Sequence, residues 1–150
     1  MPRFDFKLEP LLRYRERIEE FSRREYAEAL RLLDEERGKL DELEALYLKA
    51  CGELDALKAR GELDRWTMYS GYLSSVKEHI AGQRRIIDKV EAHLAEKRAA
   101  LAEAAREKKL IETMKEKALK LHARRVDRAE QRLADELYLA RFKKGSGDAL

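Results

Sequence analysis

Proline is nearly absent from this 150-residue sequence, and none follows Pro10. Because proline is the commonest cause of a sharp stop or kink in a helix, its absence permits very long helices. Only 7% of the residues are aromatic while 42% are charged, which leaves too little bulky apolar material for a multilayered globular core. The abundance of Ala, Glu, Lys, Leu and Arg is typical of long helices and coiled coils.

The sequence also lacks a second cysteine to pair with Cys51, so we expect a reduced thiol in a reducing compartment. No stretch approaches the roughly 18 apolar residues of a membrane-spanning helix, and the N-terminus has no basic-then-apolar signal layout. We therefore expect a cytoplasmic protein that does not insert into a membrane. The net charge of +3 is small and its signs are interspersed, so the charge does not demand an acidic partner.

The stretch Lys58–Leu73 is the one place where a nearly continuous helical pattern offers a reversal. Gly61 can adopt the left-handed conformation that ends a helix, and Asp64 can cap the helix that follows. Apolar residues on the two sides of this point mirror each other in steps of three and four, the a/d seam of a heptad coiled coil. The mirrored pairs are Leu57 with Trp66, Leu54 with Tyr69, Ala50 with Leu73, Tyr47 with Val76, Leu43 with Ile80, Leu33 with Val90 and Ala29 with Leu94.

The predicted fold class is therefore all-α, an antiparallel two-helix coiled-coil hairpin with a longer C-terminal helix. We expect an N-terminal extension at 1–7, a single coiled-coil domain at 8–142 and a flexible tail at 143–150. Within the domain, the first helix covers about 8–60, the turn about 61–64 and the second helix about 65–142.

The open end of the hairpin carries two further expectations. Between Leu11 and Phe21 the apolar series is out of step with the series that restarts at Ser22, so a slip of the seam is expected there. The position opposite Leu11 is near Glu112, so residues 113–142 are expected to have no intramolecular partner. Because a lone helix is marginally stable in water and exposes an apolar stripe, this stretch needs another surface.

Polar residues interrupt the seam of the second helix at Gln83 and Lys97, and Glu36 of the first helix lies across from Ile87. Such residues weaken a coiled coil but can fix its register.

The sequence offers little catalytic chemistry. His79, His93 and His122 are scattered, with no second histidine or cysteine at ligand spacing, so no metal site is expected. No glycine loop is placed to cradle a phosphate, because Gly145 and Gly147 belong to a tail. Carboxylates on an exposed helix cannot acquire the shifted pKa values that catalysis needs. We expect a protein that is not an enzyme and binds no cofactor.

Three stretches carry a resemblance to a known family. They are the opening RFDFKLEPLLRYRERIEE, the single tryptophan just past the turn followed by Tyr69 and Tyr72, and the late segment EKKLIETMKEKALK. Together with the total length, they make the chain similar to the FliJ family of flagellar type III export proteins.

The resemblance implies a non-enzymatic component of the export apparatus, folded like the central stalk of rotary ATPases. Such a protein inserts into the hexameric ring of the flagellar export ATPase and promotes its assembly. It also contacts the cytoplasmic side of the export gate membrane protein and recycles export chaperones. The implied location is the cytoplasm, with peripheral association to the inner-membrane export apparatus.

The resemblance also implies two contact regions. The overhang and the facing N-terminal turns would contact the ATPase ring, and the candidates are Leu11, Tyr14, Met114, Leu121, Arg125 and Arg128. The gate contact, transferred by matching the tryptophan, falls at Tyr72, Val76, His79 and Gln83, with Leu43, Leu46 and Tyr47 across from them. The seam places Val76, Gln83, Leu43 and Tyr47 in the core. The better surface candidates are therefore Leu46, Tyr72 and His79.

Two other functions fit the same residues. A generic coiled-coil adaptor or spacer would use the stripe of 111–140 to form a homodimer. A nucleic-acid binder would use the cluster Arg124–Arg132, but Asp127 and Glu130 interrupt that cluster and no aromatic residues interleave it. We therefore expect no nucleic-acid binding.

Overall fold

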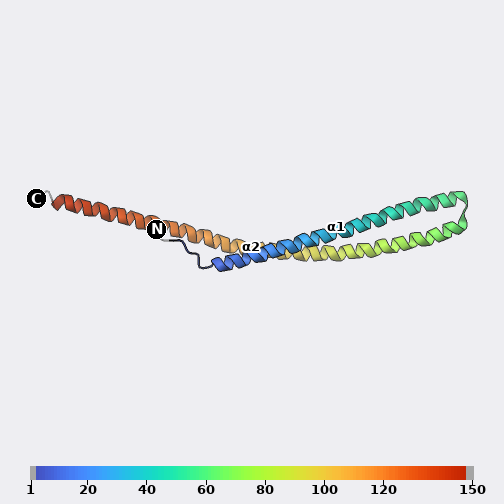
Figure 1. Cartoon of the computed structure of the whole chain (residues 1–150), viewed down its shortest axis with the longest axis horizontal. Coiled ribbons are helices and arrows are strands. Elements are labelled where there is room, and N and C mark those ends of the chain that lie inside the picture. Colours follow the sequence, from blue (N-terminus) through green and yellow to red (C-terminus); the bar gives the residue numbers. More distant parts are fainter. Residues whose placement is uncertain (1–2, 148–150) are drawn as a thin grey trace. The chain divides into compact units, whose positions relative to one another are not determined.

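The computed structural model describes residues 3–147, which form two helices (Figure 1). Helix α1 spans Glu9–Arg60 and helix α2 spans Leu63–Gly147, 52 and 85 residues respectively. No strand occurs between residues 3 and 147. The two helices pack against each other, so the predicted all-α hairpin with a longer C-terminal helix is confirmed.

Helix α2 is longer at both ends than the sequence pattern suggests. It begins at Leu63, two residues before the predicted start, and continues through Gly147. Residues 143–147, predicted as part of a flexible tail, are therefore helical, and residues 148–150 lie outside the described residues, as do residues 1–2. The extension has a physical basis, because Lys144 in the last turn interacts favourably with the negative end of the helix dipole.

The turn between the helices is a Schellman motif. Gly61 has a φ of 73°, the left-handed conformation predicted for it. The N–H of Gly61 donates to the carbonyl of Lys58 at 3.2 Å, and the N–H of Glu62 donates to the carbonyl of Leu57 at 3.1 Å. Helix α2 then starts with a bond of 3.0 Å from the Trp66 N–H to the Glu62 carbonyl. The prediction that Asp64 caps α2 is wrong, because Glu62 occupies the cap position and Asp64 lies in the first turn.

The chain divides into two compact units. Unit 1 comprises Met1–Ile18 with Ala104–Leu150, and unit 2 comprises Glu19–Glu103. Unit 2 contains the turn and the apolar core of the seam. Its buried cluster consists of Ala29, Leu33, Ile87, Val90 and Leu94, with Tyr26 and Leu40 packed against it. This cluster unites two of the predicted pairs, Ala29 with Leu94 and Leu33 with Val90, and so confirms the predicted register there.

Unit 1 has fewer buried apolar residues than unit 2, and ion pairs lie beside them. Leu12, Ala104 and Ile111 are buried. Arg15 forms an ion pair with Glu107, and Lys115 forms one with Glu9 at 2.9 Å. Because side chains of opposite charge are matched along this part of the seam, the ion pairs support the packing where apolar residues are scarce.

The segment before α1 is also packed in unit 1. Phe4, Phe6 and Leu8 are partly buried and alternate with exposed residues, the period of an extended chain. The Phe4 ring lies 5.4 Å from the ring of His122, centroid to centroid. The partly buried positions of α2 accordingly continue to Val126. The prediction that the partnerless stretch begins at Thr113 is therefore wrong, because packing in unit 1 continues for about four more turns of α2.

The predicted slip of the seam near the start of α1 is absent. Leu12 is buried and Arg15 is partly buried in unit 1, whereas Tyr14 is 55% exposed. In unit 2 Glu19 is buried and Phe21 is 64% exposed. A straight heptad phase along α1 thus places polar residues in the seam and leaves two aromatic residues outside. The long aliphatic stem of Arg15 makes this arrangement tolerable.

Candidate interaction surfaces

The end of α2 carries a run of exposed apolar side chains in unit 1. Residues 127–145, which we call the C-terminal stretch, are all exposed. Five large apolar side chains lie on it: Leu133, Leu137, Tyr138, Leu139 and Phe142, each between 56% and 70% exposed. Counted in sevens from the buried Ile111, only Leu139 of these five keeps the heptad phase of the seam. Tyr138, Leu139 and Phe142 were not recognised from the sequence, where the only signal was their number on a helix that lacks a partner.

The six residues predicted to contact an ATPase ring all lie in unit 1. Five of them are exposed: Tyr14, Met114, Leu121, Arg125 and Arg128. Leu11 is partly buried. Tyr14 lines a hollow of about 540 Å³ together with Phe6, Pro10 and Arg17. An aromatic ring beside a guanidinium offers both apolar and cationic contacts to a partner.

The seven residues predicted at the export-gate contact all lie in unit 2 and fall into two groups. Leu46, Tyr72 and His79 are exposed, and the Tyr72 ring packs edge-on against Tyr69 at 5.6 Å. Val76 and Gln83 are buried, at 5% and 8% exposure, and Tyr47 is partly buried. A hydrogen bond with Cys51 raises the pKa of the Tyr47 hydroxyl. Leu43 is also partly buried, so the structure agrees with the seam, which assigned Val76, Gln83, Leu43 and Tyr47 to the core.

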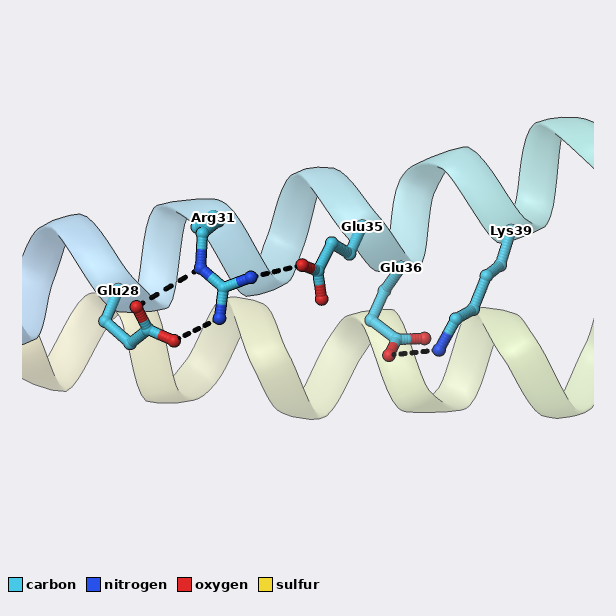
Figure 2. Close-up of polar contacts among 5 residues, drawn as sticks. All are labelled: Glu28, Arg31, Glu35, Glu36 and Lys39. Carbon is cyan, nitrogen blue, oxygen red and sulfur yellow. Dashed lines mark hydrogen bonds and ion pairs between the residues drawn. The ribbon is translucent and has the colours of Figure 1, made fainter.

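Gln83 belongs to a polar layer inside the seam of unit 2. Its side-chain amide donates to the Glu36 carbonyl at 2.9 Å and to the Glu36 carboxylate at 2.5 Å. Lys39 reaches the same carboxylate at 3.1 Å, as Figure 2 shows. The Gln83 hydrogen bond and then Lys39 hold the pKa of Glu36 below its usual range, although burial acts in the opposite direction. A satisfied layer of this kind resists sliding of one helix along the other.

Within residues 3–147 no group of three His, Cys, Asp or Glu side chains could hold a metal ion. Among the same residues, neither helix contains a segment apolar enough and long enough to cross a membrane.

The comparison with protein families decides the relationship of the chain. Residues 4–147 match the family model described as Flagellar FliJ protein. The chain belongs to the FliJ family. In the same comparisons, neither a curated protein nor a solved structure matches the chain.

Membership of the FliJ family makes the chain a component of the flagellar protein export apparatus. The family is a non-catalytic component of that apparatus. The match covers both units and includes α1, the turn, and α2 to its last described residue. The C-terminal stretch and the exposed residues of unit 2 are therefore parts of a FliJ-family fold.

Proposed function

We propose that this FliJ-family chain inserts the end of α2 into the hexameric flagellar export ATPase and couples that ring to the export gate and to export chaperones. One observation carries the proposal: a helix 85 residues long ends in a stretch whose every residue from 127 to 145 is exposed. Because an isolated helix is only marginally stable in water, the C-terminal stretch gains most from a partner that encloses it. A ring with a central opening encloses a helix on all sides.

The chemistry of unit 1 supports a ring contact. Exposed leucine, tyrosine and phenylalanine side chains of the C-terminal stretch supply apolar area, and Arg125 and Arg128 supply charge just before and at its start. Tyr14, Met114 and Leu121 extend the exposed surface toward the N-terminal segment. In protein interfaces, aromatic and arginine side chains contribute most of the binding free energy.

The gate contact is proposed at the exposed candidates Leu46, Tyr72 and His79 of unit 2. The buried candidates Val76 and Gln83 would then act indirectly, by fixing the seam beneath the contact. The chain would make these contacts at the cytoplasmic face of the inner-membrane export apparatus. We assign chaperone recycling to the chain as a whole, without particular residues.

ATP hydrolysis by the cognate export ATPase tests the ring contact. The full chain is compared with a version truncated after Val126, which keeps every packed residue of unit 1. Stimulation by the full chain should fall at least about tenfold on truncation, because truncation removes the apolar anchors of the interface. The control is Leu48→Ala, which changes an exposed leucine of unit 2 that is distant in sequence from the C-terminal stretch. This variant should stimulate ATP hydrolysis as much as the unchanged full chain does. Equal stimulation by the truncated and full chains would contradict the proposal.

The exposed apolar residues of the C-terminal stretch also favour a second function, a homodimeric spacer. Solution mass distinguishes the two functions. A dimer that persists at micromolar concentration and dissociates on truncation after Val126 would support the spacer. A monomer would support insertion into a ring.

A further inference from the structure

A hollow lies where the N-terminal segment turns into α1. Its volume is about 540 Å³, and every residue that lines it belongs to unit 1. Phe6, Pro10 and Tyr14 supply its apolar wall. Phe6 is partly buried, whereas Tyr14 is 55% exposed, so a partner can reach the apolar wall from solvent. We call this feature the N-terminal hollow.

Three cations line the same hollow: Lys7, Arg13 and Arg17. All three side chains are exposed. Within residues 3–147, no hydrogen bond or ion pair engages any of them. Arg13 and Arg17 lie four residues apart on α1, where two like charges face each other on neighbouring turns and repel. A negatively charged partner would relieve that repulsion.

The nearby carboxylates do not neutralise these cations. Elsewhere on α1 an exposed arginine pairs with a carboxylate one turn away, as Arg24 does with Glu20 at 2.7 Å. One turn before Arg13 the carboxylate is Glu9, which pairs instead with Lys115 at 2.9 Å. The positive charge of the N-terminal hollow is therefore available to another molecule.

The sign and spacing of the charges favour a protein segment over a nucleic acid. Asp5 also lines the N-terminal hollow, so a free carboxylate lies among the three cations. A nucleic-acid backbone has a charge at every phosphate and would meet that carboxylate. A peptide can place its carboxylates beside the cations and uncharged residues beside Asp5, and so complements the mixed charge better.

The spacing of the two arginines indicates how such a segment is arranged. Four residues of α1 separate Arg13 from Arg17, about 6 Å along the helix axis. In an extended peptide, side chains on one face recur every two residues, at about 6.6–6.8 Å. Two carboxylates at that spacing reach both guanidinium groups, each of which can hold a carboxylate by paired hydrogen bonds. An apolar residue one step further on the same face reaches the wall at Pro10.

The N-terminal hollow is separate from the C-terminal stretch. Arg15 pairs with Glu107 and Glu9 pairs with Lys115, so this part of α1 lies beside residues 107–115 of α2. The C-terminal stretch begins at residue 127, about 18 Å further along α2. A contact confined to that stretch leaves the N-terminal hollow open.

We propose that the N-terminal hollow binds an extended acidic segment of a partner protein, in which two carboxylates follow an apolar residue at every second position. The inference goes beyond the proposed function, because the site lies on α1 and the N-terminal segment and takes a partner other than the ATPase ring. It moves Tyr14 from the ring surface to the acidic segment.

The direct test uses two synthetic 13-residue peptides, titrated into the isotope-labelled full chain and followed by NMR. Both contain one leucine in a background of serine and glycine. One has glutamate at the second and fourth positions after the leucine, and the other has lysine there. The glutamate peptide should bind at least about tenfold more tightly at low salt and shift the amide signals of residues 5–17, and added salt should reduce the difference.

A single-stranded oligothymidylate of 13 nucleotides serves as the third probe, and it should bind more weakly than the glutamate peptide. Three results would overturn the proposal: equal affinity of the two peptides, no binding of the glutamate peptide, or tighter binding of the oligothymidylate.

Variants then locate the peptide. The double variant Arg13→Glu with Arg17→Glu should weaken binding of the glutamate peptide at least about tenfold, and Tyr14→Ala should weaken it several-fold. The matched control is Arg85→Glu with Lys89→Glu, an exposed pair of unit 2 with the same spacing and the same change of net charge. This control should bind within about twofold of the parent. Circular dichroism confirms that each variant stays helical, and equal losses for the two double variants would overturn the site.

The ring contact is tested separately. Truncation after Val126 keeps the N-terminal hollow, so the truncated chain should bind the glutamate peptide as the full chain does. An excess of the peptide should leave ATPase stimulation by the full chain unchanged, and a loss of stimulation would overturn a site separate from the ring. A failed peptide experiment beside intact ATPase stimulation would overturn the N-terminal hollow alone.

Discussion

Unit 2 joins its helices through a continuous apolar core flanked by ion pairs, whereas unit 1 joins its segments through scattered buried residues with ion pairs between them. In unit 2, Leu33, Val90 and Leu94 share one buried cluster. In unit 1, the partly exposed pairs Arg15 with Glu107 and Glu9 with Lys115 lie between a few buried residues. Exposed ion pairs contribute about 0–1 kcal/mol each, and a buried leucine contributes more. The apolar core thus stabilises unit 2, and unit 1 has the weaker packing beside the stretch proposed to enter a ring.

Truncating a core side chain in each unit should show this difference most strongly. Leu94→Ala should lower the free energy of unfolding by about 2–4 kcal/mol, because it leaves a cavity in the buried cluster. Ile111→Ala should cost less than about 2 kcal/mol, because the looser surroundings can collapse around the lost atoms. Urea unfolding followed by circular dichroism measures both. Leu137→Ala, at 59% exposure, is the control and should change stability by less than about 0.5 kcal/mol. Equal losses at Leu94 and Ile111 would remove the contrast between the units.

The N-terminal segment provides a test of intermediate size within unit 1. Phe4→Ala removes the ring contact with His122 and should cost about 1 kcal/mol of local stability. Amide hydrogens of α2 around residues 118–126 should then exchange several-fold faster, since exchange reports local opening. Hydrogen exchange with mass spectrometry measures the change. The control is Phe142→Ala on the C-terminal stretch, which should leave amide exchange at residues 118–126 unchanged. An unchanged exchange rate in Phe4→Ala would show that the N-terminal segment does not protect α2.

The polar layer of unit 2 predicts a smaller, pH-dependent effect. The pKa of Glu36 lies below its ordinary value of 4.5 in the folded chain. The folded state therefore binds fewer protons than the unfolded state, and the stabilisation is full above about pH 4.5 and is lost as pH falls through the lowered pKa. Glu36→Gln should be less stable than the parent at pH 7, and the difference should shrink below pH 4.5.

Thermal unfolding between pH 7 and pH 3 measures this difference. Gln83→Leu removes the donor with the largest effect on Glu36 and should reduce the slope of the same part of the profile. Parallel profiles for the parent and Glu36→Gln would show that the layer does not couple to pH.

Several features of the fold were accessible from the sequence because they are local. The left-handed Gly61 follows from its lack of a Cβ, and the pairing of Leu33 with Val90 follows from heptad steps counted away from the turn. The exposure of Leu46, Tyr72 and His79 follows from the same count. Each of these features depends on spacing along one helix or across one turn.

The features that were predicted wrongly depend on which of two patterns the packing follows, the spacing of apolar residues or a constant heptad phase. Near the start of α1, apolar residues at Tyr14 and Phe21 suggested a slip, yet the structure keeps the heptad phase and exposes both rings. Because a straight helix keeps its phase over many turns, the seam admits Arg15 and Glu19 rather than changing register. A residue-by-residue search for apolar positions could not detect this.

Heptad periodicity and the absence of proline after Pro10 were enough to predict a helical hairpin with a turn at Gly61 and one helix much longer than the other, because both act within a single segment. The start of the unpartnered part of α2, in contrast, depends on tertiary packing. Packing of the N-terminal segment continues to Val126, and its aromatic residues belong to no helical pattern that a count could extend. Tertiary packing also set the chemistry of each flank of the seam in unit 2, since a flank arises only when residues from two helices are brought side by side.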